Sequence, residues 1–181
     1  MEAESALEWE TLCPGGARYS EDWLGEAPLI AEGNEHRIFQ SEDGSRAIKL
    51  TRPPNFGAMG CLADYLDNFV LNNHLWGDDL RLEGIQTTTA GLQLIVSQPW
   101  IRGAPATEEE IRSFLAGKGF APCGTNAFRN SHTGIRLADA RPANIFKDHL
   151  TGLLMPVDVH VRAPEGVLTL AWEEQQRREN G

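Results

Sequence analysis

The chain has 181 residues, 41% of them hydrophobic, which is enough to bury the core of one ordinary domain or of two small lobes. Its 26 acidic and 16 basic side chains give a net charge of -10 at pH 7, the wrong sign for binding a phosphate backbone, so we expect no nucleic acid partner. No run approaches the roughly 20 apolar residues of a membrane span, and we therefore expect a cytoplasmic protein with no membrane partner.

The first half begins with residues 1–27, a mixture of acidic and aromatic side chains that we expect to form a partly ordered lead-in. Residues 28–50 then follow the pattern of strand, turn at Gly33, strand, turn at Asp43-Gly44, and strand. An Asp-Gly pair between β-rich runs indicates a hairpin because both residues tolerate positive φ. The sequence therefore predicts a three-stranded antiparallel sheet.

A helix and a second hairpin are expected next. Apolar residues recur at helical spacing between positions 62 and 76 and predict one amphipathic helix. Strands are predicted over 84–89 and 92–96, joined by a turn at Ala90-Gly91. The following segment, from Gln98-Pro99-Trp100 to Gly103, interrupts the strand pattern and is typical of a hinge.

The start of a second helix is marked by Thr107 and Glu110, which have the spacing of a capping box. In that motif the threonine hydroxyl accepts the third backbone N–H, and the glutamate accepts the backbone N–H of the threonine. A short helix is therefore expected after Thr107, ending at Gly117 or Gly119.

Several short strands are expected in the rest of the chain. Strand-like residues stand at 127–129 and 135–137, separated by a turn. A further hairpin is predicted from Asn144-Ile145-Phe146 and residues 153–157, and a terminal helix from Leu168 to about Arg178. These elements give an α+β chain with a lead-in, an amino-terminal lobe of sheet and helix over 28–98, and a second part over 99–181.

This order of parts resembles the protein-kinase-like fold. The resemblance is carried by Ala47-Ile48-Lys49 on the third strand, by the D-x-x-x-x-N pattern from Asp139 to Asn144, and by Val157-Asp158. With Asn34-Glu35-His36 and other short matches, the chain is most similar to the small kinase domains in polyvalent proteins of phages and conjugative elements. The resemblance covers about residues 28–162 and implies a minimal kinase-like fold: an antiparallel N-lobe sheet plus helix, a hinge, and a truncated C-lobe with a catalytic-loop hairpin.

The resemblance implies an ATP- and magnesium-dependent phosphotransferase with an unknown acceptor. Lys49 would offer positive charge to the phosphates, and Asp139 would accept the proton of the acceptor hydroxyl. Arg141 would neutralise charge that develops on the phosphates, although a surface salt bridge is an equally good interpretation in so acidic a protein. Asn144 and Asp158 would hold magnesium through one amide and one carboxylate oxygen.

The nucleotide itself is expected to contact the first turn and the hinge. Gly33 and Asn34 stand where kinases have their glycine-rich turn, and Asn34 also tolerates positive φ, so backbone amides there could contact phosphate. Adenine is expected against Gln98 and Trp100. Without these roles, Lys49 would be an ordinary strand lysine reaching to water, and the aspartates would cap turns.

Departures from the kinase pattern support an alternative, a catalytically silent pseudokinase that binds a nucleotide or a protein. The first turn has one glycine, and Glu35 would repel phosphate. The helix lacks the usual glutamate partner for the lysine and offers only Asp64 and Asp67, of which we favour Asp67, with Glu83 outside the helix as the alternative. The chain ends about 20 residues after Asp158, so any protein substrate is expected to dock elsewhere than on a large helical lobe. Nucleotidyl transfer on the same fold stays open as well.

Overall fold

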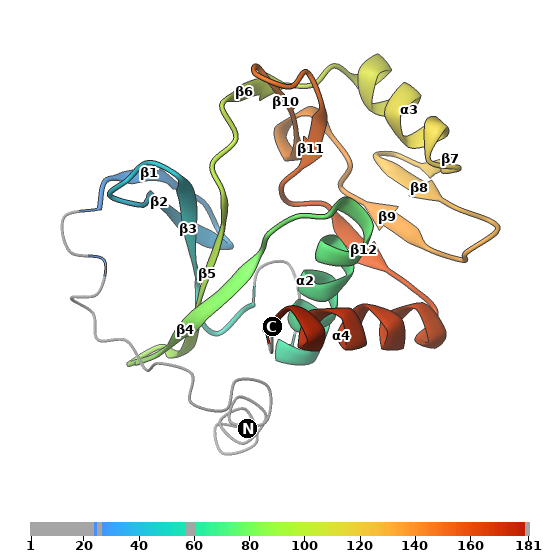
Figure 1. Ribbon diagram of the computed structural model, residues 1–181. Helices are drawn as coiled ribbons and strands as arrows, with labels where there is room; N and C mark the ends of the chain where they lie inside the picture. Colours follow the sequence, from blue (N-terminus) through green and yellow to red (C-terminus); the bar gives the residue numbers. More distant parts are fainter. Residues whose placement is uncertain (1–23, 25–26, 57–60, 180–181) are drawn as a thin grey trace. The chain divides into compact units, whose positions relative to one another are not determined.

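The computed structural model of the protein describes residue 24 and residues 27–56 and 61–179, so most of the predicted lead-in, residues 1–27, lies outside the described residues. The described chain has three antiparallel sheets and three α-helices, which confirms the predicted α+β class (Figure 1). Two compact units are present. The first comprises Met1–Leu66 and Asp79–Trp100, the second Asp67–Asp78 and Ile101–Gly181, and each is described by itself below.

The first unit is built on a five-stranded antiparallel sheet with the strand order β1-β2-β3-β5-β4. Its strands are β1 (Leu29–Glu32), β2 (His36–Gln40), β3 (Arg46–Thr51), β4 (Arg81–Thr88) and β5 (Gly91–Pro99). The predicted turn between β2 and β3 is confirmed: Gly44 has φ +68, and the Asp43 carboxylate accepts hydrogen bonds from the Ser41 hydroxyl and the Ser45 backbone N–H. Local turn chemistry thus sets the register between β2 and β3.

The predicted break of the second hairpin at Gln98 and Pro99 is wrong, because both residues belong to β5. Gln98 pairs with Ala47 and Pro99 with Arg46 on β3. Proline is tolerated here because it is the last residue of its strand, where the ladder does not need its missing N–H. The first backbone bond beyond the strand, from Trp100 N to Ser45 O at 2.8 Å, continues the pairing.

The two faces of this sheet carry different side chains. Phe39, Leu50 and Ile95 form a buried cluster on one face, with relative exposures of 9%, 2% and 1%. Lys49 precedes Leu50 on β3, and because side chains alternate along a strand, it lies on the opposite face. Lys49 pairs with Val96 on β5, and Gln98 stands two residues after Val96 on the same strand. Side chains two residues apart point to the same face, so Gln98 and Lys49 share one face of the sheet.

The second unit takes up α2 (Leu62–Trp76), the predicted helix, from Asp67 onwards. In this unit, side chains of α2 form hydrogen bonds with α4 (Glu165–Glu179) and with β12 (His160–Arg162). The Trp172 indole N–H donates to Asp67 Oδ1 at 2.9 Å, and the Asn73 amide donates to Gln175 Oε1 at 2.9 Å. These polar contacts link segments about 100 residues apart along the chain.

A four-stranded sheet and a capped helix form another part of the second unit. The sheet has the order β12-β9-β8-β7 and contains β7 (Ala121–Gly124), β8 (Ala127–Arg129) and β9 (Arg136–Ala138) in addition to β12. Helix α3 (Glu108–Gly117) confirms the predicted capping box, because Thr107 accepts from Glu110 N at 3.2 Å and donates its own N–H to Glu110 Oε2 at 2.9 Å. Strand β7 was not predicted.

A small sheet with the order β11-β10-β6 presents the predicted hairpin. Its strands are β6 (Gly103–Pro105), β10 (Ile145–Asp148) and β11 (Leu154–Pro156). Gly103, predicted as part of a hinge, instead begins β6 and pairs with Asp148. A Cβ at Gly103 would stand 2.2 Å from the Lys147 carbonyl oxygen, so only glycine allows the two backbones to approach this closely.

The terminal helix α4 begins at Glu165, three residues earlier than predicted, and its first turn is closed by a bond from Val167 N to Pro164 O at 3.0 Å. Proline before the first turn is compatible with a helix start because it has no N–H to leave unpaired. Within the described part of the chain, no helix combines the length and apolar character needed to cross a membrane.

Candidate active site

The predicted catalytic loop is a tight bend between β9 and β10 in the second unit. Asp139 follows β9 and has φ +56, a left-handed conformation that aspartate tolerates better than most residues. Ala140 N donates to Asn126 O at 2.9 Å, and the 3-10 turn η2 (Pro142–Asn144) then leads into β10. Proline at the first position of η2 fixes φ and keeps this bend short.

Asn144 holds Asp139 through its side-chain amide. Its Nδ2 donates to the Asp139 backbone oxygen at 2.9 Å and to Asp139 Oδ2 at 2.7 Å. Both partners are acceptors, so the amide nitrogen must be the atom that faces them, and the carbonyl oxygen Oδ1 is turned away. Asn144 is only 6% exposed, and its polar group is therefore fixed in one orientation.

Arg141 forms an ion pair with the same aspartate. Its Nε lies 2.8 Å from Asp139 Oδ1, and the side chains of Arg141 and Asp139 are 50% and 35% exposed. Together with the bond from Asn144, this pair engages both carboxylate oxygens of Asp139. The predicted salt bridge of Arg141 is thus present, and its partner is the predicted base.

Asp158 is brought next to this loop by backbone bonds on both sides. Val157 N donates to the Asn144 backbone oxygen at 2.9 Å, and His160 pairs with Ala138, the residue before Asp139. The short segment that carries Asp158 is therefore attached to both ends of the catalytic loop. The segments that carry Asp139, Asn144 and Asp158 are thus joined by backbone hydrogen bonds within the second unit.

Lys49 lies in the first unit, on β3 between Ile38 of β2 and Val96 of β5, and is 7% exposed. The two acids considered as its partners have other contacts. Glu83 accepts a hydrogen bond from the Ser97 hydroxyl, and Ser97 faces the side of the sheet opposite to Lys49. Asp67 accepts the indole N–H of Trp172 within the second unit.

Gln98, in the first unit, has a buried side-chain oxygen that lacks a hydrogen-bond donor among the described residues. It is 4% exposed, and its Oε1 has no hydrogen-bond partner among the described residues. A buried acceptor without a donor costs free energy, so such groups are rare in folded proteins. Trp100, the other residue predicted to contact adenine, is half-buried just after β5.

The turn at Gly33 and Asn34 differs from the expected glycine turn. Of these two residues, neither has a positive φ, and a Cβ at Gly33 would meet no atom closer than 4.0 Å. The Gly33 N–H donates to His36 O at 2.9 Å, so this amide is already used in the hairpin. Arg52 secures the turn by donating to Glu32 Oε1 at 2.7 Å and to Gly33 O at 3.0 Å. The tolerance of Asn34 for positive φ is therefore not used in this turn.

Asn126 was missed by reasoning from the sequence, although its backbone oxygen supports the catalytic loop through Ala140. Its φ of 51 places it in the left-handed region. The available signal was the Gly124-Thr125-Asn126 run between strand-like segments, because asparagine is common at left-handed turn positions.

Each unit holds oxygen atoms of a kind that could contact magnesium or a nucleotide. In the second unit, the Asn144 Oδ1, which is turned away from Asp139, and the Asp158 carboxylate are hard oxygen atoms of the type that magnesium prefers. The orphaned oxygen of Gln98 can accept a hydrogen bond from an amino group such as that of adenine.

Residues 9–163 match the family described as Serine/Threonine/Tyrosine Kinase found in polyvalent proteins. The chain belongs to this family of kinases. The predicted resemblance is therefore confirmed, and Lys49, Asp139, Asn144 and Asp158 all fall inside the matched range. The match also begins earlier than the predicted residue 28, so part of the lead-in belongs to the family domain. No curated protein matches the chain.

Proposed function

We propose that this member of the kinase family is an ATP- and magnesium-dependent phosphotransferase whose acceptor is a protein hydroxyl. The observation that carries the proposal is the clasp of Asp139 by Asn144, which fixes a carboxylate and leaves one amide oxygen for a cation. The description of the family, which names serine, threonine and tyrosine, supports a hydroxyl acceptor.

Magnesium would be held by Asn144 and Asp158 in the second unit. The Asn144 amide adds an oxygen ligand without adding charge, while Asp158 supplies the negative charge that attracts the ion. When bound, magnesium and ATP would supply a transferable γ-phosphoryl group with its charge partly neutralised. The tie from Val157 N to Asn144 O supports this assignment because it holds the two ligand residues near each other.

The nucleotide would be bound by residues of the first unit. Lys49 would pair with phosphate oxygens from its buried position on β3. Gln98 Oε1 would accept a hydrogen bond from the adenine amino group, and Trp100 would pack against the ring. Gly33 and Asn34 would border the phosphates, with Gly33 contributing no amide because its N–H is bonded to His36.

Asp139 would accept the proton of the acceptor hydroxyl and orient that hydroxyl towards phosphorus. Its Oδ1 is paired with Arg141, whose side chain is half exposed and can move to the transferring phosphoryl group. We expect Arg141 to release Asp139 when substrates bind and then to neutralise the charge that develops during transfer.

The test compares transfer from ATP labelled in the γ-phosphate with transfer from ATP labelled in the α-phosphate, using casein as acceptor. The wild type should transfer the γ label alone, and Asp139→Asn should reduce the rate about 100-fold or more, because it removes the base. The control is Glu109→Gln, an exposed glutamate of α3. Transfer of the α label would indicate nucleotidyl transfer, and an equal rate for Asp139→Asn would contradict the role of Asp139.

A silent binding module is the second candidate, and one observation favours it. Both carboxylate oxygens of Asp139 already have partners within the chain, one in Arg141 and the other in Asn144. In this arrangement the carboxylate is less able to accept the proton of an acceptor hydroxyl. The same experiment separates the two functions. A module of this kind would bind ATP but transfer neither label, and Arg141→Gln would not create activity.

A further inference from the structure

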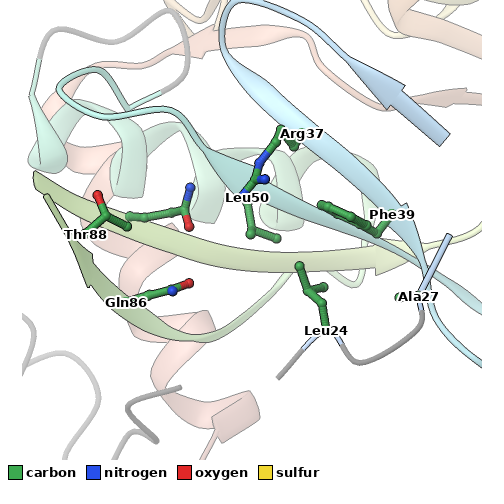
Figure 2. A pocket seen from close by; sticks show the side chains of 8 residues that line it. Leu24, Ala27, Arg37, Phe39, Leu50, Gln86 and Thr88 are labelled. Atoms are coloured by element: carbon green, nitrogen blue, oxygen red, sulfur yellow. The ribbon is translucent and has the colours of Figure 1, made fainter. Parts of the chain in front are cut away.

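A pocket lies on the sheet of the first unit, on the face opposite to Lys49, and Figure 2 shows the side chains around it. Its volume is about 400 Å³, within the range of small-molecule sites. Leu50 lines it directly after Lys49 on β3, and alternation along the strand turns the two side chains to opposite faces. The pocket is therefore distinct from the candidate active site and does not depend on the proposed function.

One end of this pocket is apolar. Phe39 and Leu50 form its floor from two neighbouring strands, and Leu24 and Ala27 pack against the same cluster. Figure 2 shows Phe39, Leu24 and Ala27 gathered at this end. The ring of Phe39 and the branched side chains offer a surface for an apolar body such as an aromatic ring.

The other end is polar. Gln86 and Gln93 pair directly across β4 and β5 and are 8% and 5% exposed, and Thr88 lies beyond them. Gln93 Nε2 donates to the Thr51 backbone oxygen at 2.7 Å, and the Thr88 hydroxyl donates to Gly91 O at 2.9 Å. No hydrogen bond from the described residues reaches the side-chain amide of Gln86, which is thus able to donate to a ligand.

Arg37 supplies a positive charge at the boundary between the two ends. It stands on β2 opposite Leu50, and its guanidinium carbon lies 5.8 Å from the centre of the Phe39 ring. Three other arginines on or directly beside this sheet each pair with a carboxylate, namely Arg46, Arg52 and Arg81, whereas no carboxylate of the described residues pairs with Arg37. In a chain with a net charge of -10, a guanidinium that pairs with no carboxylate of the described residues and lies beside a pocket favours an anionic ligand.

We infer that this pocket binds a small organic anion with an apolar body, of the class of aromatic carboxylates and sulfonates. The apolar part would lie on Phe39, Leu50 and Leu24, while the anionic group would accept hydrogen bonds from Arg37 and from the free amide of Gln86. Of the described residues, Arg37 is the one cation that lines the pocket, so a single anionic group is matched and a triphosphate is not.

The experiment is a fluorescence titration of the full chain with 8-anilinonaphthalene-1-sulfonate, which has an aromatic body and one sulfonate. The wild type should show saturable binding to one site, unaffected by excess magnesium and ATP. Arg37→Gln should weaken binding about tenfold, because a hydrogen bond to a charged group is lost. The matched control is Arg52→Gln, which removes an arginine that directly follows β3, is 44% exposed and is paired with Glu32.

Gln86→Leu provides a second variant of similar side-chain volume, and it should weaken binding without affecting the charge of Arg37. Thermal unfolding of each variant identifies any change that comes from loss of the fold. Absence of saturable binding to the wild type overturns the inference. The inference is also overturned if Arg37→Gln and Gln86→Leu bind the probe as tightly as the wild type does. It is overturned as well if Arg52→Gln weakens binding as much as Arg37→Gln, or if ATP displaces the probe.

Discussion

At the scale of single residues, Asn144 joins the structure of the catalytic loop to its proposed chemistry. Its buried amide makes two hydrogen bonds to Asp139, so replacing it with leucine removes one donor from the Asp139 backbone oxygen and one from its carboxylate, and leaves both with their bonds to Arg141. We expect Asn144→Leu to lower the free energy of unfolding by about 1–3 kcal/mol, the usual cost of a lost buried partner. Urea denaturation measures it, with Asn55→Leu at an exposed position as control. An equal, small loss in both variants would contradict the clasp.

The Glu110 carboxyl gives a pH-dependent prediction. Hydrogen bonds from the Lys147 ammonium, at 2.7 Å, and then from Thr107 lower the pKa of Glu110 from 4.5 to about 2. Because the pKa is lower in the folded state, the carboxylate stabilises the fold above the unfolded value and loses this effect as pH falls towards 2.

The measurement compares the melting temperatures of the wild type and Glu110→Gln. The wild type should melt higher at pH 7, and the difference should shrink progressively between pH 4.5 and the pKa of about 2. Glu109→Gln, an exposed neighbour in the same first turn, should show no comparable change with pH. A difference that is constant with pH would show that the two bonds to Lys147 and Thr107 do not hold this carboxylate.

At the scale of elements, the close approach of β6 to β10 depends on Gly103. A methyl group at this position would meet the Lys147 carbonyl oxygen at 2.2 Å, and the strands would have to separate. We expect Gly103→Ala to lower the free energy of unfolding by about 1–3 kcal/mol, as overpacking does in cores. Gly117→Ala is the control, because no atom stands within 4 Å of its Cβ position and alanine favours helix. Equal stability of the two variants would contradict the account of β6.

Elements with strong local signals were predictable from the sequence. Helix α2 and the turn at Asp43-Gly44 follow from helical spacing and turn chemistry within a few residues, and the capping box of α3 needs only Thr107 and Glu110. Strands β6 and β7 could not be predicted in this way. They have three and four residues, include proline and glycine, and β6 owes its existence to pairing with β10, about 40 residues further along the chain.

Those parts of the site that depend on local sequence signals were predictable as well. The order of Lys49, Asp139, Asn144 and Asp158 is visible in the sequence, and the hairpin formed by β10 and β11 explains why the segments that carry Asn144 and Asp158 lie side by side. The contacts of Asp67 could not be foreseen, since its partner Trp172 lies on α4, 105 residues later. Nor could the pairing of Arg141 with Asp139, because the orientation of both side chains depends on the left-handed turn at Asp139.

At the scale of the whole molecule, the chain combines family membership with acidic overall charge. A net charge of -10 disfavours the approach of ATP, so binding should depend on magnesium and on the local charge of Lys49. We expect Lys49→Met to weaken ATP binding about tenfold or more, because it removes a charge-assisted contact to phosphate. Calorimetric titration with magnesium and ATP measures this, with Lys118→Met at an exposed position as control. Equal affinities of wild type and Lys49→Met would contradict the role of Lys49.

The central claim, a magnesium and nucleotide site that includes Asn144 and Asp158, is tested most directly by thermal stability with magnesium and ATP. With ligand at 100 times its dissociation constant, the wild type should gain about 2.7 kcal/mol of stability. Asp158→Asn should lose most of this gain, whereas Glu109→Gln should keep it. If magnesium and ATP stabilise neither the wild type nor the control, or stabilise Asp158→Asn equally, the claim is contradicted.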